Sequence, residues 1–375
     1  MKLTLFIQNF SDGGAQHMIV NTANEFAKRG HDVDLLVVNG NGPHIDKVEK
    51  DVHLVNLGKR RSLAALWGLS RYIRTRQPDI FLSAMTHTNI VSVMARFLAP
   101  FSSTRLILTE RTLLSMHIRE TPRLQEKFFL AGVKFFYRFA DKVIGISRGV
   151  AEDIQSLARL KPHQVGYIYN PVITSAMQAQ LRETSSDLMP EKKDGAFLIV
   201  TSGRLSYEKD QETLLKAFEK LRHTHNAKLV ILGDGPLRAD LERQVEELGI
   251  QNHVVFAGFV PNSLAYMKQA DLFVITSLYE GFCNVIVEAL LCGLSVVSTN
   301  APSGPPEILE EGKYGLLAPV GDSNAIAQAM AQALKEPFDP QKQKERASCF
   351  TVEKICDQYE ALFQIMIERQ PERQE

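Results

Sequence analysis

Residues 271–299, DLFVITSLYEGFCNVIVEALLCGLSVVST, contain a pattern from which the architecture can be inferred. An apolar run ends in a polar loop, a helical pattern follows, and a second apolar run comes after it. A strand, a helix and a strand in this order predict two parallel strands joined by a right-handed crossover. Ligands bind such sheets beyond the carboxyl ends of the strands, so the loop that contains Glu280 is a candidate site.

The same alternation extends through the whole chain. The apolar runs expected to form strands are LTLFI (3–7), DLLVV (34–38), DIFLSA (79–84), RLILT (105–109), KVIGI (142–146), VGYIY (165–169), AFLIVTS (196–202), KLVILG (228–233), VVFAG (254–258), DLFVIT (271–276), LSVVST (294–299) and GLLAP (315–319). This order predicts an α/β protein of two doubly wound, parallel-sheet, Rossmann-like domains facing a central cleft.

The domain boundary is predicted from a change in composition. The polar segment 182–195 separates the two sets of apolar runs and is the expected linker. We place the first domain at 1–172 and the second at 173–350. A helix at about 351–368 has one apolar side and is expected to pack back across the junction.

Composition excludes several classes of protein. The 375 residues are 45% hydrophobic and 23% charged, which is typical of globular domains and not of disordered chains. Forty-three basic and 43 acidic side chains balance, which argues against a dedicated nucleic-acid binder, although residues 59–148 hold sixteen basic and five acidic ones. The four cysteines form no close pair, so no zinc site or disulfide framework is indicated. No signal-peptide core or membrane-spanning run is evident, so we expect a cytoplasmic protein.

In the first domain, glycines and ionisable side chains follow three of the expected strands. Gly13 and Gly14 open a helix after the first strand, where backbone amides favour an anion, and a tight turn is the alternative. His87 follows the strand at 79–84, although a lone histidine is more often structural. Glu110 and Arg111 follow the strand at 105–109, and an ion pair within the loop is the alternative for them.

In the second domain, Arg204 and Lys209 lie between a strand end and an amphipathic helix. Forked arginine donors and a lysine point charge suit a diphosphate, and two solvated surface cations are the alternative. Glu280 lies in the loop after the expected strand at 271–276, and Glu288 follows eight positions later within the apolar run VIVEALL. A buried carboxylate there needs partners, which two sugar hydroxyls or a neighbouring lysine or amide would supply.

Taken together, GG, GRL…EK, GDGP (233–236), EGF with glutamates eight positions apart, and PSGPPEIL (302–309) closely resemble glycosyltransferase family 4. The likeness is strongest between residues 201 and 320. It implies a retaining enzyme of the GT-B fold that moves a sugar from a nucleotide diphosphate sugar to an acceptor. TERT (109–112) and PSGPPEIL are similar to members that build bacterial surface polysaccharide, lipopolysaccharide or glycolipid, which favours a UDP-sugar.

The resemblance also implies roles for single residues. Arg204 and Lys209 match the cations that hold the donor diphosphate. Glu288 matches the carboxylate that binds the ribose, and Glu280 matches the one that contacts the transferred sugar. The other donor-binding positions are Gly14, Gly258, Phe259, Gly281, Phe282, Cys283, Asn284 and Val285. We assign Gly13 and His87 to the acceptor. Donor binding in the family does not depend on a metal, so we expect no metal and no cofactor.

Two positions depart from the family pattern. TERT occupies the loop that contains a histidine in many members, so Arg111 or Glu110 stands in its place as the catalytic candidate, together with Glu280, Arg204 and Lys209. Which of the two acts stays open. Cys283 replaces a common proline and is expected to expose a thiol near the site.

The mechanism that we favour stabilises charge on the leaving diphosphate. Arg204, Lys209 and helix-start amides would lower the barrier electrostatically. No carboxylate nucleophile is evident, so the acceptor would attack from the face that the diphosphate leaves, while a phosphate oxygen assists its deprotonation. Closure of the domains would exclude water. The alternatives are a sugar-nucleotide epimerase or phosphorylase on the same fold, and a degenerate transferase that acts as a binding partner.

Two segments of the first domain suggest how the acceptor is reached. KRRSLAALWGLSRYIRTR (59–76) combines cations with Leu63, Leu66, Trp67, Leu69 and Ile73, as an interfacial helix on anionic lipid would. FFLAGVKFFYRF (128–139) adds aromatic side chains. Ordinary helices that cover the sheet are the alternative. The expected partners are thus a nucleotide-sugar donor, a lipid-linked or saccharide acceptor and, peripherally, the inner face of the cytoplasmic membrane, but no nucleic acid.

Overall fold

The computed structural model describes residues 1–11, 14–100, 102–120, 124–181 and 195–368. They form two compact units. The N-terminal unit contains residues 1–171 and the chain from residue 352 onward, and the C-terminal unit contains residues 172–351. The chain therefore passes between units at 171/172 and again at 351/352. The predicted linker, apart from Gly195, lies outside the described residues.

The N-terminal unit is built on a seven-stranded parallel sheet with the order β3-β2-β1-β4-β5-β6-β7. Its strands are β1 (Lys2–Ile7), β2 (Asp32–Val37), β3 (His53–Asn56), β4 (Ile80–Ala84), β5 (Arg105–Glu110), β6 (Lys142–Gly145) and β7 (Val165–Tyr167). The sequence analysis missed β3, which is a short, largely exposed edge strand and therefore has no apolar run.

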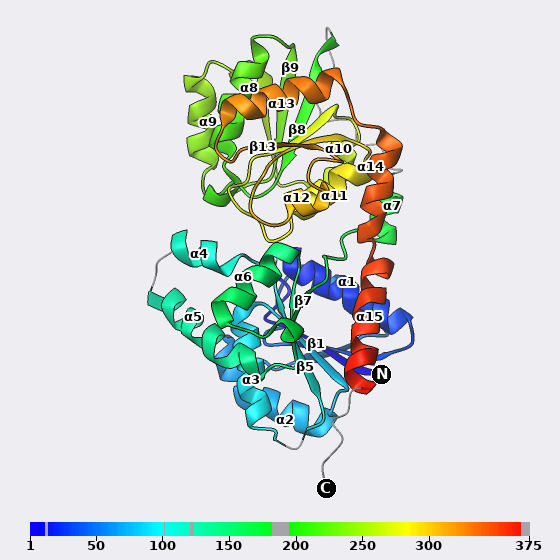
Figure 1. The fold of residues 1–375 in the computed structure, drawn as a ribbon. Coiled ribbons are helices and arrows are strands. Elements are labelled where there is room, and N and C mark those ends of the chain that lie inside the picture. Colours follow the sequence, from blue (N-terminus) through cyan, green and yellow to red (C-terminus); the bar gives the residue numbers. More distant parts are fainter. Residues whose placement is uncertain (12–13, 101, 121–123, 182–194, 369–375) are drawn as a thin grey trace. The chain divides into compact units, whose positions relative to one another are not determined.

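Helices cover both faces of this sheet, which explains why its strands read as continuous apolar runs. They are α1 (Gly14–Lys28), α2 (Leu66–Arg76), α3 (Thr86–Phe97), α4 (Leu114–Glu120), α5 (Leu124–Phe136), α6 (Arg148–Ala158) and α15 (Val352–Glu368). Leu35 packs with α1 and α15 on one face, whereas its neighbour Leu36 packs with α2 and α3 on the other (Figure 1). Among the described residues, no helix combines the length and apolarity needed to cross a bilayer.

The C-terminal helix α15 is anchored to the N-terminal unit by apolar contacts and charge. Tyr359 and Phe363 are buried in the core formed with α1. Arg29, directly after α1, donates to Asp357 at 2.7 Å and to Glu360 at 2.8 Å. The last helix of the sequence therefore folds with the first domain rather than with the second.

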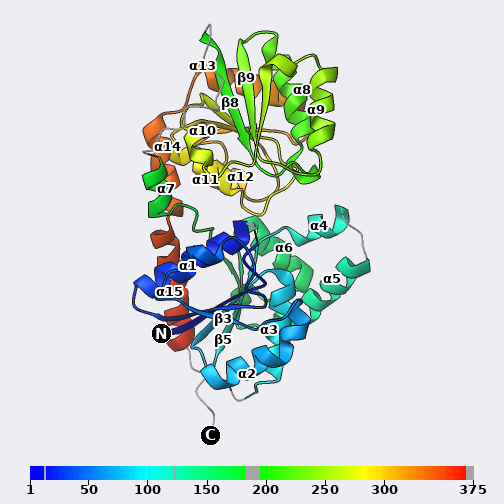
Figure 2. The ribbon, with the colours of Figure 1, turned by 180° about the vertical axis from the view of Figure 1, so that it is seen from behind.

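The C-terminal unit repeats the doubly wound plan with six parallel strands in the order β10-β9-β8-β11-β12-β13 (Figure 2). The strands are β8 (Phe197–Ser202), β9 (Ala227–Leu232), β10 (Val254–Gly258), β11 (Leu272–Ile275), β12 (Ser295–Thr299) and β13 (Leu316–Ala318). Its helices are α7 (Ser175–Gln180), α8 (Gln211–Arg222), α9 (Arg238–Glu247), α10 (Ser263–Met267), α11 (Asn284–Leu291), α12 (Pro305–Ile308), α13 (Ser323–Lys335) and α14 (Pro340–Ala347). The strand order reverses between β8 and β11, which is where such sheets bind ligands.

Candidate active site

An ion pair lies at the point of reversal in the C-terminal unit. Lys209 ends a short 3₁₀ turn after β8, and Glu280 lies in the loop after β11. The Lys209 ammonium contacts the Glu280 carboxylate, and both side chains are largely buried. Ser277 Oγ donates to Glu280 Oε1 at 2.7 Å. Burial alone would lower the pKa of Lys209, but the attraction of Glu280 outweighs it and raises the pKa, so the lysine stays charged.

Hydrogen bonds to backbone carbonyl groups hold these two loops together. Thr276 Oγ1 donates to the carbonyl oxygens of Lys209, at 3.1 Å, and of Asp210, at 2.8 Å. The Leu278 amide donates to the Glu208 carbonyl at 2.8 Å. The loops after β8 and β11 are thus fixed against each other, which positions the cation and the carboxylate together.

Three glycines bring the neighbouring loops close to the site. Gly233 has a φ of +127°, and its amide donates to the Gly258 carbonyl at 2.7 Å. A Cβ on Gly233 would lie 2.0 Å from the carbonyl oxygen of Gly203, so only glycine fits there. The exposed side chain of Arg204 follows Gly203, and Phe259, which follows Gly258, is 75% exposed. The carboxyl edge of β8, β9 and β10 therefore presents close-packed backbone, the Arg204 side chain and the Phe259 ring.

Glu288 lies on the adjacent helix α11. Its Oε2 atom accepts a hydrogen bond from Ser263 Oγ at 2.9 Å. Burial raises the pKa of Glu288, and the Ser263 hydrogen bond opposes that rise. An ionised carboxylate can accept about four hydrogen bonds, and Ser263 donates one of them. The Glu288 side chain therefore retains acceptor capacity for a diol.

The start of α11 is packed tightly against the PSGPPEIL loop. Gly304 has a φ of +49°, and a Cβ there would lie 2.4 Å from the Phe282 carbonyl oxygen. The Phe282 ring is buried against Phe350, with centroids 5.5 Å apart. Cys283 is also buried and adopts a left-handed φ of +77° ahead of the helix. The expectation of an exposed thiol was wrong, because the turn that begins α11 directs this residue inward, where burial raises the pKa of the thiol.

In the N-terminal unit, Glu110 ends β5 and is 1% exposed. Its carboxylate accepts from Thr86 Oγ1 at 3.1 Å, from Asn89 Nδ2 at 3.0 Å and from the Tyr137 hydroxyl. Burial raises its pKa to about 7, and the three hydrogen bonds only partly oppose this rise. Glu110 is therefore enclosed by protein groups and joins the start of α3 to Tyr137, the residue that follows α5.

Glu110→Gln tests this buried carboxyl. Because its pKa is raised from 4.5 to about 7, its stabilising contribution is complete below pH 4.5 and is lost as the pH rises through 7. The free energy of unfolding of the natural protein should thus fall by on the order of 3 kcal/mol over this range, and the variant should lack that fall. Urea unfolding followed by circular dichroism measures it, with exposed Glu152→Gln as the control. Equal pH slopes in all three proteins would contradict the assignment.

Arg111 follows Glu110 directly and is largely desolvated. Its Nη1 atom donates to Asn170 Oδ1 at 3.1 Å. Its Nε atom is buried and has no hydrogen-bond partner among the described residues. Burial lowers the pKa of Arg111, against the influence of Tyr359 and Glu110, but a guanidinium stays charged in proteins. A cation with unused donor capacity is therefore fixed at the end of β5.

The remaining predicted positions lie at the carboxyl ends of β1 and β4. Gly14 begins α1 and is exposed, whereas Gly13 lies outside the described residues. His87 lies in the first turn of α3 and is half-buried. Burial lowers the pKa of His87, so its imidazole is neutral near pH 7.

Two family models together match most of the chain. The model described as Glycosyltransferase Family 4 matches residues 12–176, and the model described as Glycosyl transferases group 1 matches residues 187–349. The chain is a glycosyltransferase of the family 4 type. The identification made from its motifs is confirmed, as is the expectation of an enzyme.

Relatives resemble this glycosyltransferase over nearly its full length. The N-acetylgalactosamine-N,N'-diacetylbacillosaminyl-diphospho-undecaprenol 4-alpha-N-acetylgalactosaminyltransferase of Campylobacter jejuni is 28% identical, with 95% of this chain and 97% of that protein covered. The lipopolysaccharide core biosynthesis glycosyltransferase LpsE of Rhizobium meliloti is 26% identical, with 90% and 89% covered. The crystal structure of Anabaena HepE in complex with UDP matches with a TM-score of 0.77 at 22% identity, covering 97% of this chain and 100% of that one. The GT-B class of two Rossmann-like units is confirmed.

Within this glycosyltransferase, the predicted donor positions other than Gly14 lie in the C-terminal unit. Glu110, Arg111, His87 and Gly14 lie in the N-terminal unit. Sequence reasoning missed the partners that fix the charged groups, which are Ser277, Thr276, Ser263, Asn89, Tyr137 and Asn170. Ser277 and Thr276 follow a strand directly and could have been suspected, whereas the others become neighbours only through the tertiary fold.

Proposed function

We propose that this glycosyltransferase moves a sugar from a UDP-sugar to a lipid-linked or polysaccharide acceptor, with retention of anomeric configuration. The Lys209–Glu280 pair supports this most directly. A fixed cation suits the diphosphate, and a carboxylate beside it suits the hydroxyls of the sugar attached to that diphosphate. The two charges thus match the diphosphate and the attached sugar of a nucleotide sugar.

The surroundings of the pair match the rest of the donor. Arg204 supplies a second, exposed cation for the diphosphate. Phe259 offers a ring on which a base can stack, and the Gly233–Gly258 contact lets the ligand approach the backbone. Glu288, which accepts a hydrogen bond from Ser263, would also accept hydrogen bonds from both ribose hydroxyls. Structural neighbours solved with UDP, HepE among them, support uridine as the nucleoside of the donor.

The chemistry follows from these charges. Breaking the bond between the anomeric carbon and the phosphate oxygen places its electron pair on UDP, and Lys209 and Arg204 stabilise that charge. The acceptor oxygen bonds to the anomeric carbon on the same face, and its proton passes to a leaving phosphate oxygen. Glu280 and Glu288 are the two carboxylates among the predicted donor positions, and both are assigned to binding hydroxyl groups. No predicted donor position is therefore left to act as a carboxylate nucleophile, which is consistent with attack from the same face and hence with retention.

The acceptor class is proposed from the relatives. The Campylobacter jejuni protein is named for a diphospho-undecaprenol substrate, and the Rhizobium meliloti protein for lipopolysaccharide core synthesis. A lipid-linked saccharide on the cytoplasmic face of the membrane fits both names. The N-terminal unit would bind it, with the C-terminal unit holding the donor.

A nucleotide panel tests the donor assignment. UDP should raise the melting temperature more than GDP or ADP do, because a ligand that binds only the folded state stabilises it. Glu288→Gln should weaken UDP binding by roughly tenfold, since a charged acceptor of the ribose diol is lost. Exposed Glu247→Gln serves as the matched control. A stronger response to GDP than to UDP, or normal UDP binding by Glu288→Gln, would contradict this part of the proposal.

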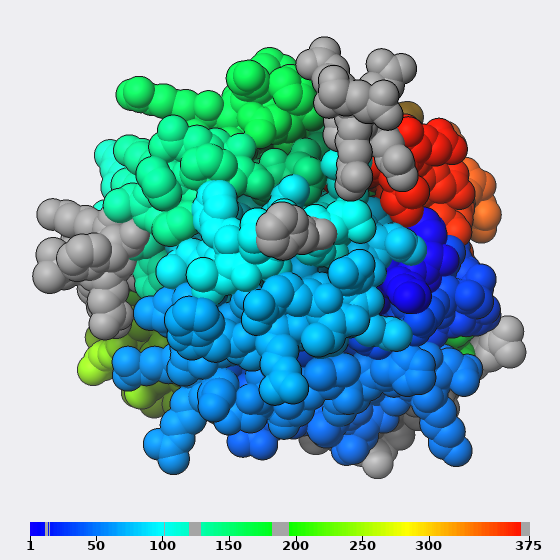
Figure 3. Space-filling model, turned by 90° about the horizontal axis from the view of Figure 1, so that it is seen from below, coloured from blue at the N-terminus to red at the C-terminus, as the bar shows by residue number. Residues whose placement is uncertain are grey.

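Membrane contact is proposed for the outer surface of α2. The structure corrects the sequence picture, because Leu69 and Ile73 are buried in the core. Leu63 and Trp67 remain 62% and 73% exposed, among the exposed cations Arg60, Arg61, Arg71 and Arg74. Figure 3 shows α2 (light blue) beside the end of α3 (cyan) on one face. That surface suits an anionic bilayer.

Vesicle flotation tests this contact. The protein should float with vesicles containing phosphatidylglycerol and not with phosphatidylcholine alone. Trp67→Ser should reduce flotation by roughly tenfold, because an exposed aromatic anchor is removed. Tyr207→Ser, which alters an exposed aromatic residue of the C-terminal unit, is the control. Equal flotation with both vesicle types would overturn the proposal.

A further inference from the structure

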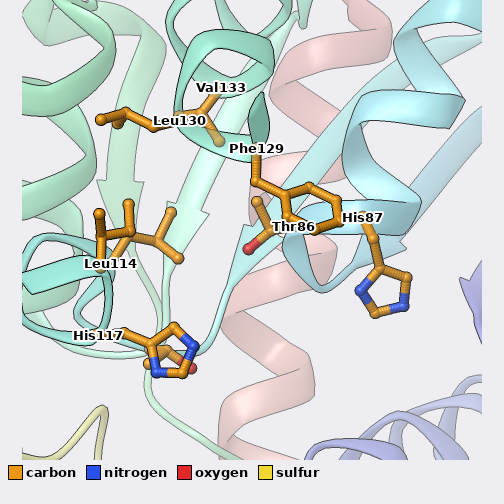
Figure 4. Close-up of a pocket in the computed structure, with 9 residues that line it drawn as sticks. Thr86, His87, Leu114, His117, Phe129, Leu130 and Val133 are labelled. Atoms are coloured by element: carbon orange, nitrogen blue, oxygen red, sulfur yellow. The ribbon is translucent and has the colours of Figure 1, made fainter. Parts of the chain in front are cut away.

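A cavity of about 300 Å³ lies within the N-terminal unit, at the carboxyl edge of its sheet. The first turn of α3 and the residue after Arg111 line part of it, and residues of α4 and α5 line the rest (Figure 4). Its volume is at the lower end of the range for small-molecule sites, so it admits one ring-sized group rather than a long chain. Its position beyond β4 and β5 is where doubly wound sheets bind ligands.

One side of the cavity is polar but carries no fixed charge. Thr86, His87, Thr112 and His117 line it, and none of the described lining residues is acidic, lysine or arginine. Thr86 is held in place because its hydroxyl donates to the buried Glu110 carboxylate at 3.1 Å. These hydroxyls and imidazoles can donate and accept hydrogen bonds, but the described lining supplies no lysine or arginine to pair with a phosphate.

The other side is apolar. Leu114 and Ile118 come from α4, and Phe129, Leu130 and Val133 come from α5. Leu114 and Val133 are buried, and the ring of Phe129 is 39% exposed. Figure 4 shows this ring reaching from α5 toward the start of α3. The cavity therefore has an apolar wall opposite a hydrogen-bonding wall.

These two walls select among the chemical groups of an acceptor. A polyprenyl chain would leave the imidazoles and hydroxyls against hydrocarbon, which costs free energy. A simple hexose would turn hydroxyls toward the leucine, isoleucine and valine side chains. An N-acylated sugar has a methyl group for the apolar wall, and it has an amide and ring hydroxyls for the polar wall.

We propose that this cavity binds an N-acetylated sugar of the acceptor, with the acetyl methyl group packed against α4 and α5. The inference rests on the proposed function for the acceptor role of the site, but the binding itself does not depend on transfer. It makes Ile118, Phe129 and His87 determinants of acceptor specificity. The buried Glu110 then acts as a positioning residue, because it fixes the Thr86 side of the cavity.

Saturation-transfer NMR on the full chain tests the inference without any reaction. The probes are the methyl glycosides of N-acetylglucosamine, N-acetylgalactosamine, glucose and galactose. The acetyl methyl protons should receive the strongest saturation, and the two simple hexosides should show little. Phe129→Ser and Ile118→Asn should each weaken binding of the N-acetylated glycosides by roughly fivefold, since apolar contact with the methyl group is lost.

Ile365→Asn makes the same replacement at a 48% exposed position of α15, outside the cavity lining, and should bind like the natural protein. A cooperative thermal transition shows that each variant is folded, and the UDP-induced rise in melting temperature reports on the donor site separately. Equal saturation of all four glycosides, or unchanged binding in both cavity variants, would overturn the inference. If UDP gives no stabilisation while the cavity variants behave as expected, the proposed function fails and the N-acetyl sugar site stands.

Discussion

Lys209→Met lowers the rate of sugar transfer by roughly 100- to 1000-fold, the loss expected when one electrostatic stabiliser of a developing charge is removed. Methionine keeps the length and most of the volume of the lysine stem, so packing around the 3₁₀ turn is preserved. The charge that stabilises the leaving diphosphate is lost. The measurement is the release of UDP from a UDP-sugar in the presence of acceptor, at saturating and at limiting donor.

The same change also affects stability, and the two effects can be separated. Glu280 is largely buried beside Lys209, so removing the lysine leaves a carboxylate without its cation and costs about 3 kcal/mol. Lys209→Met combined with Glu280→Gln should recover most of this stability but none of the activity. Lys335→Met, at an exposed position of the same unit, is the control. Near-normal transfer by a folded Lys209→Met protein would contradict the role of the pair.

The doubly wound fold could be predicted because strands that are buried on both faces of a sheet consist mainly of apolar residues. The four residues LFVI of β11 are all apolar since this strand is covered on both sides, and the same holds for residues 35–37 of β2. The edge strand β3 gave no such signal, because its residues are mostly exposed. An apolar run in the sequence thus indicates a buried strand, and this signal is missing where the strand is mostly exposed.

The site could be predicted only in part, for a related reason. Residues that follow strands share one edge of the sheet, so Lys209 and Glu280 could be expected together from topology. Whether a side chain there faces solvent depends on local backbone conformation. Cys283 turns inward because its φ is +77°, and Phe282 packs on the distant Phe350. Sequence spacing cannot supply either fact.

The loop after β5 lacks the histidine that many family members have there, and either Glu110 or Arg111 must take its place. The structure favours Arg111, and this can be tested. Its Nε atom is buried without a partner among the described residues, and such a donor costs free energy unless a ligand uses it. Glu110, in contrast, has three protein partners and is 1% exposed. Of the two residues that stand in place of the usual histidine, Arg111 is therefore the one that we expect to contact substrate.

Arg111→Lys should lower kcat by roughly 100-fold, because an ammonium cannot reproduce the forked donors of a guanidinium. UDP should stabilise the variant as it does the natural protein, since the donor residues lie in the C-terminal unit. Asn170→Ala, which removes the partner of Arg111 Nη1, should give a smaller loss of roughly tenfold. Arg159→Lys, at an exposed position, is the matched control. If Glu110→Gln lost as much activity at unchanged stability while Arg111→Lys stayed active, the assignment of the two residues would have to be reversed, and the buried carboxyl would have to reach substrate through a rearrangement of α3.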